Sequence, residues 1–370
     1  MIVWPWGKRA HQKSQLSQFL SGELLRDAVS FLSRGKATLA YRQFGISSEL
    51  FEDFSYPELH PIEQDTRVQH RIVELNKHIE NAAAERAYER FARVAYERIP
   101  RLIAPSLSDF EVHKKLITLQ LAATERVHMH IVSDPDSLAS ELLRFSVALH
   151  DSSIMISSSG SKTLFSSAKK TIKDDEDLLK RSSEGILAIS SVEQLKPADK
   201  KVLAEVLDSG MYTPDPSKAG KRHTACRLLS CSTPTRIVGK QPDILRRQIT
   251  LDPFVLDEIH VVSIVKNTKR PTQRSFTINR SDYEFVKGFY SYVENTKVGV
   301  PSELEEKIYS YVELLKTEKD TVVEVTSTRI VGMIRLAKAR ARLSLRSEIR
   351  EDDVKEAYAL IRAALALPKE

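Results

Sequence analysis

Cysteine is almost absent from this sequence, with Cys226 and Cys231 as the two in 370 residues. Two cysteines exclude a disulfide framework. A zinc site would need two more ligands close by, and only His223 offers itself. Both cysteines lie in the alternating run Cys-Arg-Leu-Leu-Ser-Cys, so we interpret them as small buried residues of a strand.

Long hydrophobic runs are also absent. No apolar stretch approaches the roughly 18 residues of a membrane-spanning helix, and the opening Met-Ile-Val-Trp-Pro-Trp lacks the apolar region of a signal peptide. We therefore expect a soluble, cytoplasmic protein without membrane contact. The net charge of +6 permits binding to nucleic acid, but 56 basic residues are interspersed with 50 acidic ones, so charge alone favours a solvated surface.

The length and the pattern of apolar residues predict two or three domains. Residues 66–94 carry apolar side chains three or four positions apart, which predicts helices with one packed face. From residue 99 onward, strand-like and helical segments alternate, and residues 280–370 are helical again. We expect a helical N-terminal region at 1–97, an α/β core at 98–278 and a helical C-terminal region at 279–370.

The central region predicts a mostly parallel sheet covered by helices on both faces. Predicted strands are 127–132, 154–156, 186–189, 227–230 and 259–265, and predicted helices include 138–149 and 198–207. Near the C-terminus, Met333, Ala337 and Ala341 share one helix face while Arg335 and Arg342 lie on another. A final helix is expected to start near residue 351, because the acids of Glu-Asp-Asp suit a helix N-terminus.

Several segments of this region also match, in order and at similar spacing, the motifs of one family. These are 103–106 followed by Lys114-Lys115, the turn Ser-Asp-Pro-Asp-Ser-Leu-Ala-Ser at 133–140, the strand at 185–195, Lys-Pro-Ala-Asp at 196–199, Ser-Lys-Ala-Gly at 217–220, the strand at 226–234 and the helix at 333–342. The chain thereby resembles the AAA+ motor domain of the minichromosome maintenance (MCM) replicative helicases, particularly archaeal ones. The resemblance covers residues 99–361 and implies an α/β AAA+ fold with a phosphate-loop-type parallel sheet and an α-helical lid.

The resemblance also identifies where a nucleotide would bind. A working phosphate loop reads G-x-x-x-x-G-K-[ST], in which glycines let backbone N–H groups surround the phosphates and lysine neutralises them. Ser133 and Asp136 stand at the two glycine positions and Ala139 stands at the lysine position, so only Ser140 matches. The positive charge is missing, and Asp136 adds a negative one.

The other catalytic positions implied by the resemblance also lack the side chains that catalysis requires. The strand that should end in Asp-Glu ends in Ser190-Ser191, and Thr233 stands where an asparagine would orient water. Glu258 replaces the arginine finger, and Thr328, next to Arg329, stands at the lid arginine. Phosphoryl transfer depends on such charges, so we predict an inactive ATPase without a cofactor, while weak binding of ATP and magnesium stays open.

DNA is the partner that the resemblance implies. The family's hairpin lysine corresponds to Lys218, and Lys221 and Arg222 follow it, so these three side chains are predicted to contact DNA phosphates. The segment 166–184, where the family has a second DNA-probing insertion, is shorter than usual. The family's N-terminal barrel and zinc module and its C-terminal winged helix have no counterpart in this sequence, and the oligomeric state stays open.

Three functions are compatible with this pattern. The first is a catalytically inactive MCM-like protein that acts as an accessory or regulatory component of DNA replication by binding DNA, an MCM-type helicase or other replication proteins. The second is a protein-interaction module that contacts neither DNA nor nucleotide and docks through the N-terminal helices. The third is an ATP-binding subunit of a DNA helicase that is completed by neighbouring subunits.

Overall fold

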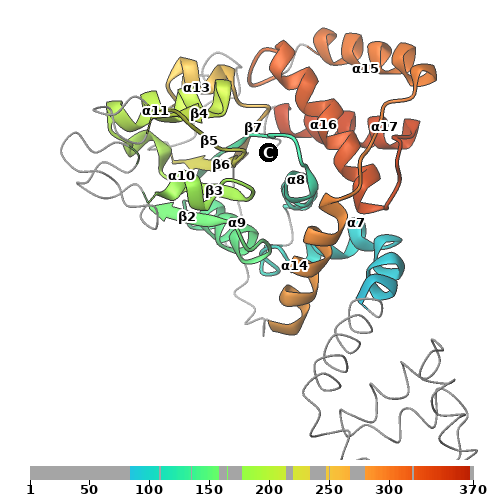
Figure 1. The fold of residues 1–370 in the computed structure, drawn as a ribbon. Coiled ribbons are helices and arrows are strands. Elements are labelled where there is room, and N and C mark those ends of the chain that lie inside the picture. The colour runs from blue at the N-terminus through green and yellow to red at the C-terminus, as the bar shows by residue number, and fades with distance from the viewer. Residues whose placement is uncertain are drawn as a thin grey trace, which may run out of the picture. The chain divides into compact units, whose positions relative to one another are not determined.

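The computed structural model of the chain describes residues 84–107, 110–134, 136–157, 165, 177–213, 220–233, 247–249, 251–266, 280–318 and 321–366. The chain divides into two compact units, residues 1–90 and 91–370. In the first unit, the described residues 84–90 are helical. Everything else described here belongs to the second unit, whose elements are drawn in Figure 1. None of the described helices combines the length and the apolar composition that crossing a bilayer requires.

A five-stranded parallel sheet forms the centre of the second unit, in the strand order β2-β3-β6-β1-β7. The central strand β1 pairs with β6 on one side and with β7 on the other, with Met129 opposite both Leu229 and Val261. All residues of β3 and β6 are buried, as expected for a parallel sheet covered on both faces. The strands are β1 (Met129–Asp134), β2 (Ile154–Ser157), β3 (Ile186–Ser190), β6 (Arg227–Ser232) and β7 (Val261–Lys266). The predicted α/β sheet is therefore confirmed, and both cysteines are buried in or beside β6.

Helices alternate with these strands along the chain. They are α7 (Ala95–Arg98), η2 (Ile99–Leu102), α8 (Glu111–Ala122), α9 (Asp136–Ala148), α10 (Leu178–Arg181), η3 (Val192–Gln194), α11 (Pro197–Ser209) and α13 (Pro253–Asp257). Helix α9 packs against β1, β3 and β6. Helix α11 begins with a proline in its first turn and ends at Gly210, whose φ of 72° is left-handed. A Cβ on Gly210 would also lie 3.1 Å from the carbonyl oxygen of Thr224, so both backbone and space favour glycine there.

The C-terminal residues form the helical region that the sequence predicts. Its elements, orange to red in Figure 1, are α14 (Arg280–Glu294), η4 (Ser302–Leu304), α15 (Glu305–Thr317), α16 (Ser327–Leu343) and α17 (Glu351–Leu365). Helix α17 starts at the predicted residue, with three acids in its first turn. Helix α16 buries the expected face, Met333, Ala337 and Ala341. Its arginine face is not a solvent face, because Arg342 is also buried and donates to the carbonyl of Ala122 at 3.0 Å.

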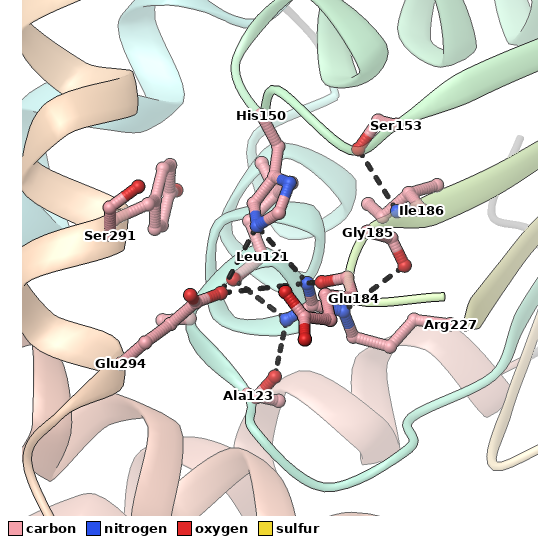
Figure 2. Close-up of polar contacts among 12 residues, drawn as sticks. Leu121, Ala123, His150, Ser153, Glu184, Gly185, Ile186, Arg227, Ser291 and Glu294 are labelled. Carbon is pink, nitrogen blue, oxygen red and sulfur yellow. Dashed lines mark hydrogen bonds and ion pairs between the residues drawn. The ribbon is translucent and has the colours of Figure 1, made fainter. Parts of the chain in front are cut away.

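One buried arginine joins the sheet to α8, to His150 and to α14. Figure 2 shows the guanidinium of Arg227, the first residue of β6, with its nitrogens directed at backbone carbonyls. The acceptors are the carbonyl oxygens of Gln120, Leu121, Ala123, Glu184 and Gly185. Glu294 of α14 lies 3.9 Å from this guanidinium and 3.1 Å from His150 Nε2. Arg227 thus brings a positive charge to the carbonyl end of α8, where the helix dipole favours one.

Buried histidines make part of the sheet polar. His130 on β1 places Nδ1 2.9 Å from the hydroxyl of Ser230 and Nε2 3.0 Å from that of Ser232, both on β6. Burial lowers the pKa of His130 to about 3, so the ring is neutral at ordinary pH and has one donor and one acceptor. A serine hydroxyl can serve as either, which lets both ring nitrogens be satisfied inside the sheet.

Candidate functional site

The carboxyl ends of β1, β3 and β6 lie at one edge of the sheet, because these parallel strands are neighbours. The chain leaves β1 toward β2 on one side and returns to pair with its other side at β7. Ligands of open parallel sheets bind at such a reversal. The topology therefore brings together the ends of three strands that carry predicted site residues, namely Ser133, Ser190 and Thr233.

The turn after β1 is short. Ser133 and Asp134 continue the strand and lie opposite Val265 and Lys266 of β7, and α9 already begins at Asp136. A phosphate loop needs several consecutive backbone N–H groups that converge outside regular structure. Here Ser133 and Asp134 belong to β1, and Asp136 is the first residue of α9. The side chain of Asp136 lies outside the described part of the chain.

Ala139 and Ser140 lie in the first turns of α9. Ala139 is 1% exposed, so the position at which the resemblance implies a lysine carries a methyl group inside the protein. Ser140 is half-buried. The site therefore has no positive side chain at this position to balance phosphate charge.

Hydroxyl groups occupy the ends of the two neighbouring strands. The hydroxyl of Ser190 donates to the carbonyl of Ile156 on β2 at 3.3 Å. Ser191 adopts a left-handed φ of 54° and leads into the short helix η3. Thr233 follows β6, and its Oγ1 is buried without a hydrogen-bond partner among the described residues. These neutral groups are weak ligands for magnesium, which prefers carboxylates. Among the described residues, no group of three or more His, Cys, Asp or Glu side chains is placed to hold a metal ion.

The surroundings of Glu258 are acidic. Glu258 ends α13 and is half-buried. Burial raises its pKa, and the nearby charges of Asp208 and Asp257 raise it further. The resemblance implies a positively charged arginine finger at this position. Glu258 and its acidic neighbours instead carry negative charge there, which would repel a phosphate.

The first turn of α16 contains Thr328 and Arg329. Thr328 is half-buried, whereas Arg329 is 2% exposed and donates from Nη1 to the hydroxyl of Thr326 at 2.7 Å. Burial lowers the pKa of Arg329 to about 10, against the attraction of Asp257 and Glu324. This arginine is therefore held inside the protein, near the acidic end of α13.

Two short antiparallel strands, β4 (Met211–Tyr212) and β5 (Arg222–His223), lie on either side of the segment predicted to contact DNA. Lys218 lies outside the described residues. Lys221 is exposed, and no ion pair to it occurs in the described part of the chain. Arg222 differs, because its Nη1 donates to Oδ2 of Asp177 at 2.9 Å. Of Lys221 and Arg222, it is thus Lys221 that extends into solvent without an ion pair to a described residue.

Asp177 and Tyr212 are hairpin contacts that the sequence did not predict. Asp177 is 4% exposed, caps α10 and accepts a hydrogen bond from the hydroxyl of Tyr212 at 2.7 Å. The one sequence signal for Asp177 is its place directly before Leu-Leu-Lys-Arg, where aspartate commonly caps a helix. Nothing in the sequence connects it to Tyr212, because the two are brought together by the fold of the hairpin.

Comparison with known proteins places this geometry in context. The MCM AAA-lid domain family matches residues 284–365. The DNA replication licensing factor mcm4 of Schizosaccharomyces pombe is 23% identical over 319 residues, which cover 73% of this chain and 35% of that protein. MCM4 of Arabidopsis thaliana is 23% identical over 315 residues, covering 73% and 37%. The minichromosome maintenance protein MCM of Saccharolobus solfataricus is 20% identical over 268 residues, covering 65% and 38%. The chain spans little more than a third of the length of these relatives.

Proposed function

Because this chain is a homologue of the MCM replication proteins and carries their lid domain at residues 284–365, we propose that it acts in DNA replication without hydrolysing ATP. It would serve as an accessory or regulatory component that binds DNA, an MCM-type ring, or both. In this proposal residues 98–278 are the AAA+ core, residues 279–370 the lid and residues 1–97 a separate helical region.

The observation that best supports the absence of ATP hydrolysis is the buried methyl group of Ala139. Catalysis of phosphoryl transfer rests on positioning and on neutralising the phosphates. Ala139 provides no charge and is enclosed in the first turns of α9. The strand pairing of Ser133 and Asp134 supports the same proposal, since backbone N–H groups in a strand do not converge on a phosphate.

The other altered positions also support the proposal. Ser190 and Ser191 offer hydroxyls where a catalytic site would hold magnesium through a carboxylate and activate water with a second one. Glu258 lies beside Asp208 and Asp257, and this acidic group would repel the phosphates of a nucleotide in a neighbouring subunit. Supply of an arginine finger by a neighbour could restore one charge, but a neighbour does not readily supply the missing lysine.

Calorimetric titration with millimolar ATP and magnesium tests the nucleotide part of the proposal. We expect no binding heat and no phosphate release, with an active MCM protein as the positive control under the same conditions. The matched variant is Ser140→Ala, because Ser140 is the one position that fits a phosphate loop. Binding with a defined stoichiometry that weakens in Ser140→Ala would contradict the proposal, whereas activity unchanged by this substitution would point to a contaminating ATPase.

Lys221 supports the DNA part of the proposal. It lies exposed directly before β5, and a lysine on a hairpin can contact phosphates and release condensed counterions. Such contacts carry no information on base sequence. We therefore propose that Lys221 binds the DNA backbone and that Lys218 is a second contact. The main role of Arg222 in this proposal is its bond to Asp177.

Fluorescence anisotropy with a labelled single-stranded oligonucleotide tests this contact. Lys221→Ala should weaken binding and reduce the slope of log K against log salt by about one. Lys355→Ala is the matched control, since Lys355 is exposed on α17 and its replacement removes the same charge from another surface. Equal effects of both variants would mean that only net charge matters. A wild-type protein without affinity for DNA would favour the protein-interaction module instead.

A further inference from the structure

The hairpin is too small to hold its own shape. Its strands contribute two residues each, with Met211 opposite His223 and Tyr212 opposite Arg222. Two-stranded hairpins in water are marginally stable even when they are longer. The direction in which Lys221 extends must therefore be set by contacts between the base of the hairpin and the rest of the protein.

Asp177 makes such a contact with both strands at once. Its Oδ2 accepts a hydrogen bond from the hydroxyl of Tyr212 at 2.7 Å and another from Nη1 of Arg222 at 2.9 Å. Its Oδ1 accepts from the backbone N–H of Lys180 at 3.2 Å. Tyr212 and Arg222 are directly opposed across the hairpin. One carboxylate therefore connects both β4 and β5 to the start of α10 through hydrogen bonds.

The environment of Asp177 makes these bonds strong. Asp177 is 4% exposed, and hydrogen bonds to a charged group are stronger than neutral ones, especially away from water. Burial raises the pKa of Tyr212, and its bond to Asp177 raises it further, so the phenol remains a donor at neutral pH. Thr224 adds a second attachment, since its hydroxyl donates to the carbonyl of Leu179 at 3.0 Å.

We propose that Asp177 is a positioning residue for DNA binding, which fixes the hairpin so that Lys221 meets the phosphate backbone. This inference rests on the proposed function, because it assumes that the hairpin contacts DNA. Asp177 is an acid next to a DNA-binding element. If long-range electrostatics acted alone, removal of its charge would therefore raise the affinity for DNA. Positioning requires the opposite, namely that removal lowers the affinity.

The test compares Asp177→Asn with the wild type in the full-length chain by anisotropy with single-stranded DNA across a salt series. An asparagine has one acceptor oxygen and one amide that only donates, so it cannot accept as the carboxylate does at both oxygens. We expect the affinity to fall about three- to tenfold, and no further than in Lys221→Ala, with a salt slope reduced by about one although no cation was removed. An affinity that stays the same or rises would overturn the inference.

A double-mutant cycle separates positioning from a general loss of structure. If Asp177 acts through Lys221, Asp177→Asn should have little further effect in the Lys221→Ala background, because effects that share one contact are not additive. Full additivity would contradict the inference. Tyr212→Phe is the second variant, since it removes one of the bonds to Asp177 without a change of charge, and we expect it to weaken binding by a smaller factor.

Hydrogen exchange of the hairpin amides provides a readout that does not involve DNA. Exchange in residues 211–213 and 220–224 should become faster in Asp177→Asn and in Tyr212→Phe, while exchange in the central sheet stays slow. Unchanged exchange in both variants would show that Asp177 does not hold the hairpin. If the wild type binds DNA and only the Asp177 experiments fail, the proposed function survives without this inference. If the wild type does not bind DNA, this inference and the DNA part of the proposed function are both overturned.

Discussion

Replacement of Arg227 by methionine should lower the stability of the second unit more than most single substitutions. Arg227 is 3% exposed, and burial lowers its pKa, which shows that the surroundings penalise its charge. A buried ion pair can often be replaced by apolar side chains at little cost, provided that both partners are replaced. Here the main partners are backbone carbonyls (Figure 2), which no substitution removes.

The magnitude follows from the carbonyls that lose a donor. Those of Gln120 and Gly185 keep backbone N–H donors, from Ala123 at 3.3 Å and from Arg227 itself at 3.0 Å. That of Glu184 belongs to an exposed residue, so water can replace the lost donor. The carbonyls of Leu121 and Ala123 are buried and have no other donor among the described residues. An unsatisfied buried acceptor costs about 1–3 kcal/mol, so two cost about 2–6 kcal/mol. We expect a loss of about 4 kcal/mol, because methionine preserves most of the apolar contact of the arginine stem.

Urea unfolding followed by circular dichroism measures this loss. With an m-value of about 3 kcal/mol/M, a loss of 4 kcal/mol lowers the midpoint by roughly 1.3 M. Arg227→Lys should lie between methionine and the wild type, since an ammonium group lacks the planar fork that reaches carbonyls in several directions.

The control for this prediction is Glu294→Gln. The side chain of Glu294 is 31% exposed and lies 3.9 Å from the guanidinium, so solvent screens the pair and its loss should cost less than about 1 kcal/mol. A methionine variant that loses less than about 1 kcal/mol would refute the carbonyl argument. A glutamine variant as unstable as the methionine variant would show that the ion pair, and not the carbonyls, carries the stability.

Substitutions at three further positions have defined outcomes. Gly332→Ala should cost about 1–3 kcal/mol in urea unfolding, because its Cβ would lie 2.7 Å from the Cβ of His260; a neutral result would mean that α16 can shift. Gly210→Ala should cost about 1–2 kcal/mol because of its positive φ, and Gly210→Asn, which tolerates this conformation better, should recover part of the loss. Burial raises the pKa of Asp353, but bonds from Arg346 and from a backbone N–H outweigh this and leave the pKa lowered. The stability that Asp353 contributes is therefore present above pH of about 4 and is lost as pH falls through the lowered pKa. The loss of unfolding free energy in Asp353→Asn should therefore become smaller in acid. A loss that does not depend on pH would exclude the charge as its source.

Most of the sheet could be predicted from sequence because parallel strands buried on both faces are mostly apolar. The strand after residue 127 is instructive, since it was expected to end at Val132 and continues through Asp134. Pairing with β7 at Val265 and Lys266 extends it, and such pairing overrides the low strand preference of Ser and Asp. Helix α8 was not predicted. It buries Lys114 and Gln120 along with its apolar residues, so its sequence lacks the clear apolar face by which amphipathic helices are recognised.

The candidate site could be predicted only as positions along the chain. The resemblance identified the site positions one by one without a strand order, and the structure places Ser133, Ser190 and Thr233 at neighbouring strand ends. Side-chain partners could not be predicted, because they join residues far apart in sequence. The sequence predicts that Arg222 contacts DNA, but its bond to Asp177 spans 45 positions and depends on the hairpin register. A cluster of cations in the sequence does not reveal which of them is already engaged.

The contacts of Arg227 and Arg342 also bear on how this chain can vary. Both guanidinium groups donate largely to main-chain oxygens, such as those of Leu121, Ala122 and Thr296. Every residue type supplies the same oxygen, so these bonds themselves place no demand on the acceptor side chains. Glu184 is exposed and Thr296 is half-buried, and these acceptor positions are open to substitution, whereas burial still constrains Leu121 and Ala122. A saturation library should therefore tolerate many side chains at Glu184 and Thr296 and few at the two arginines.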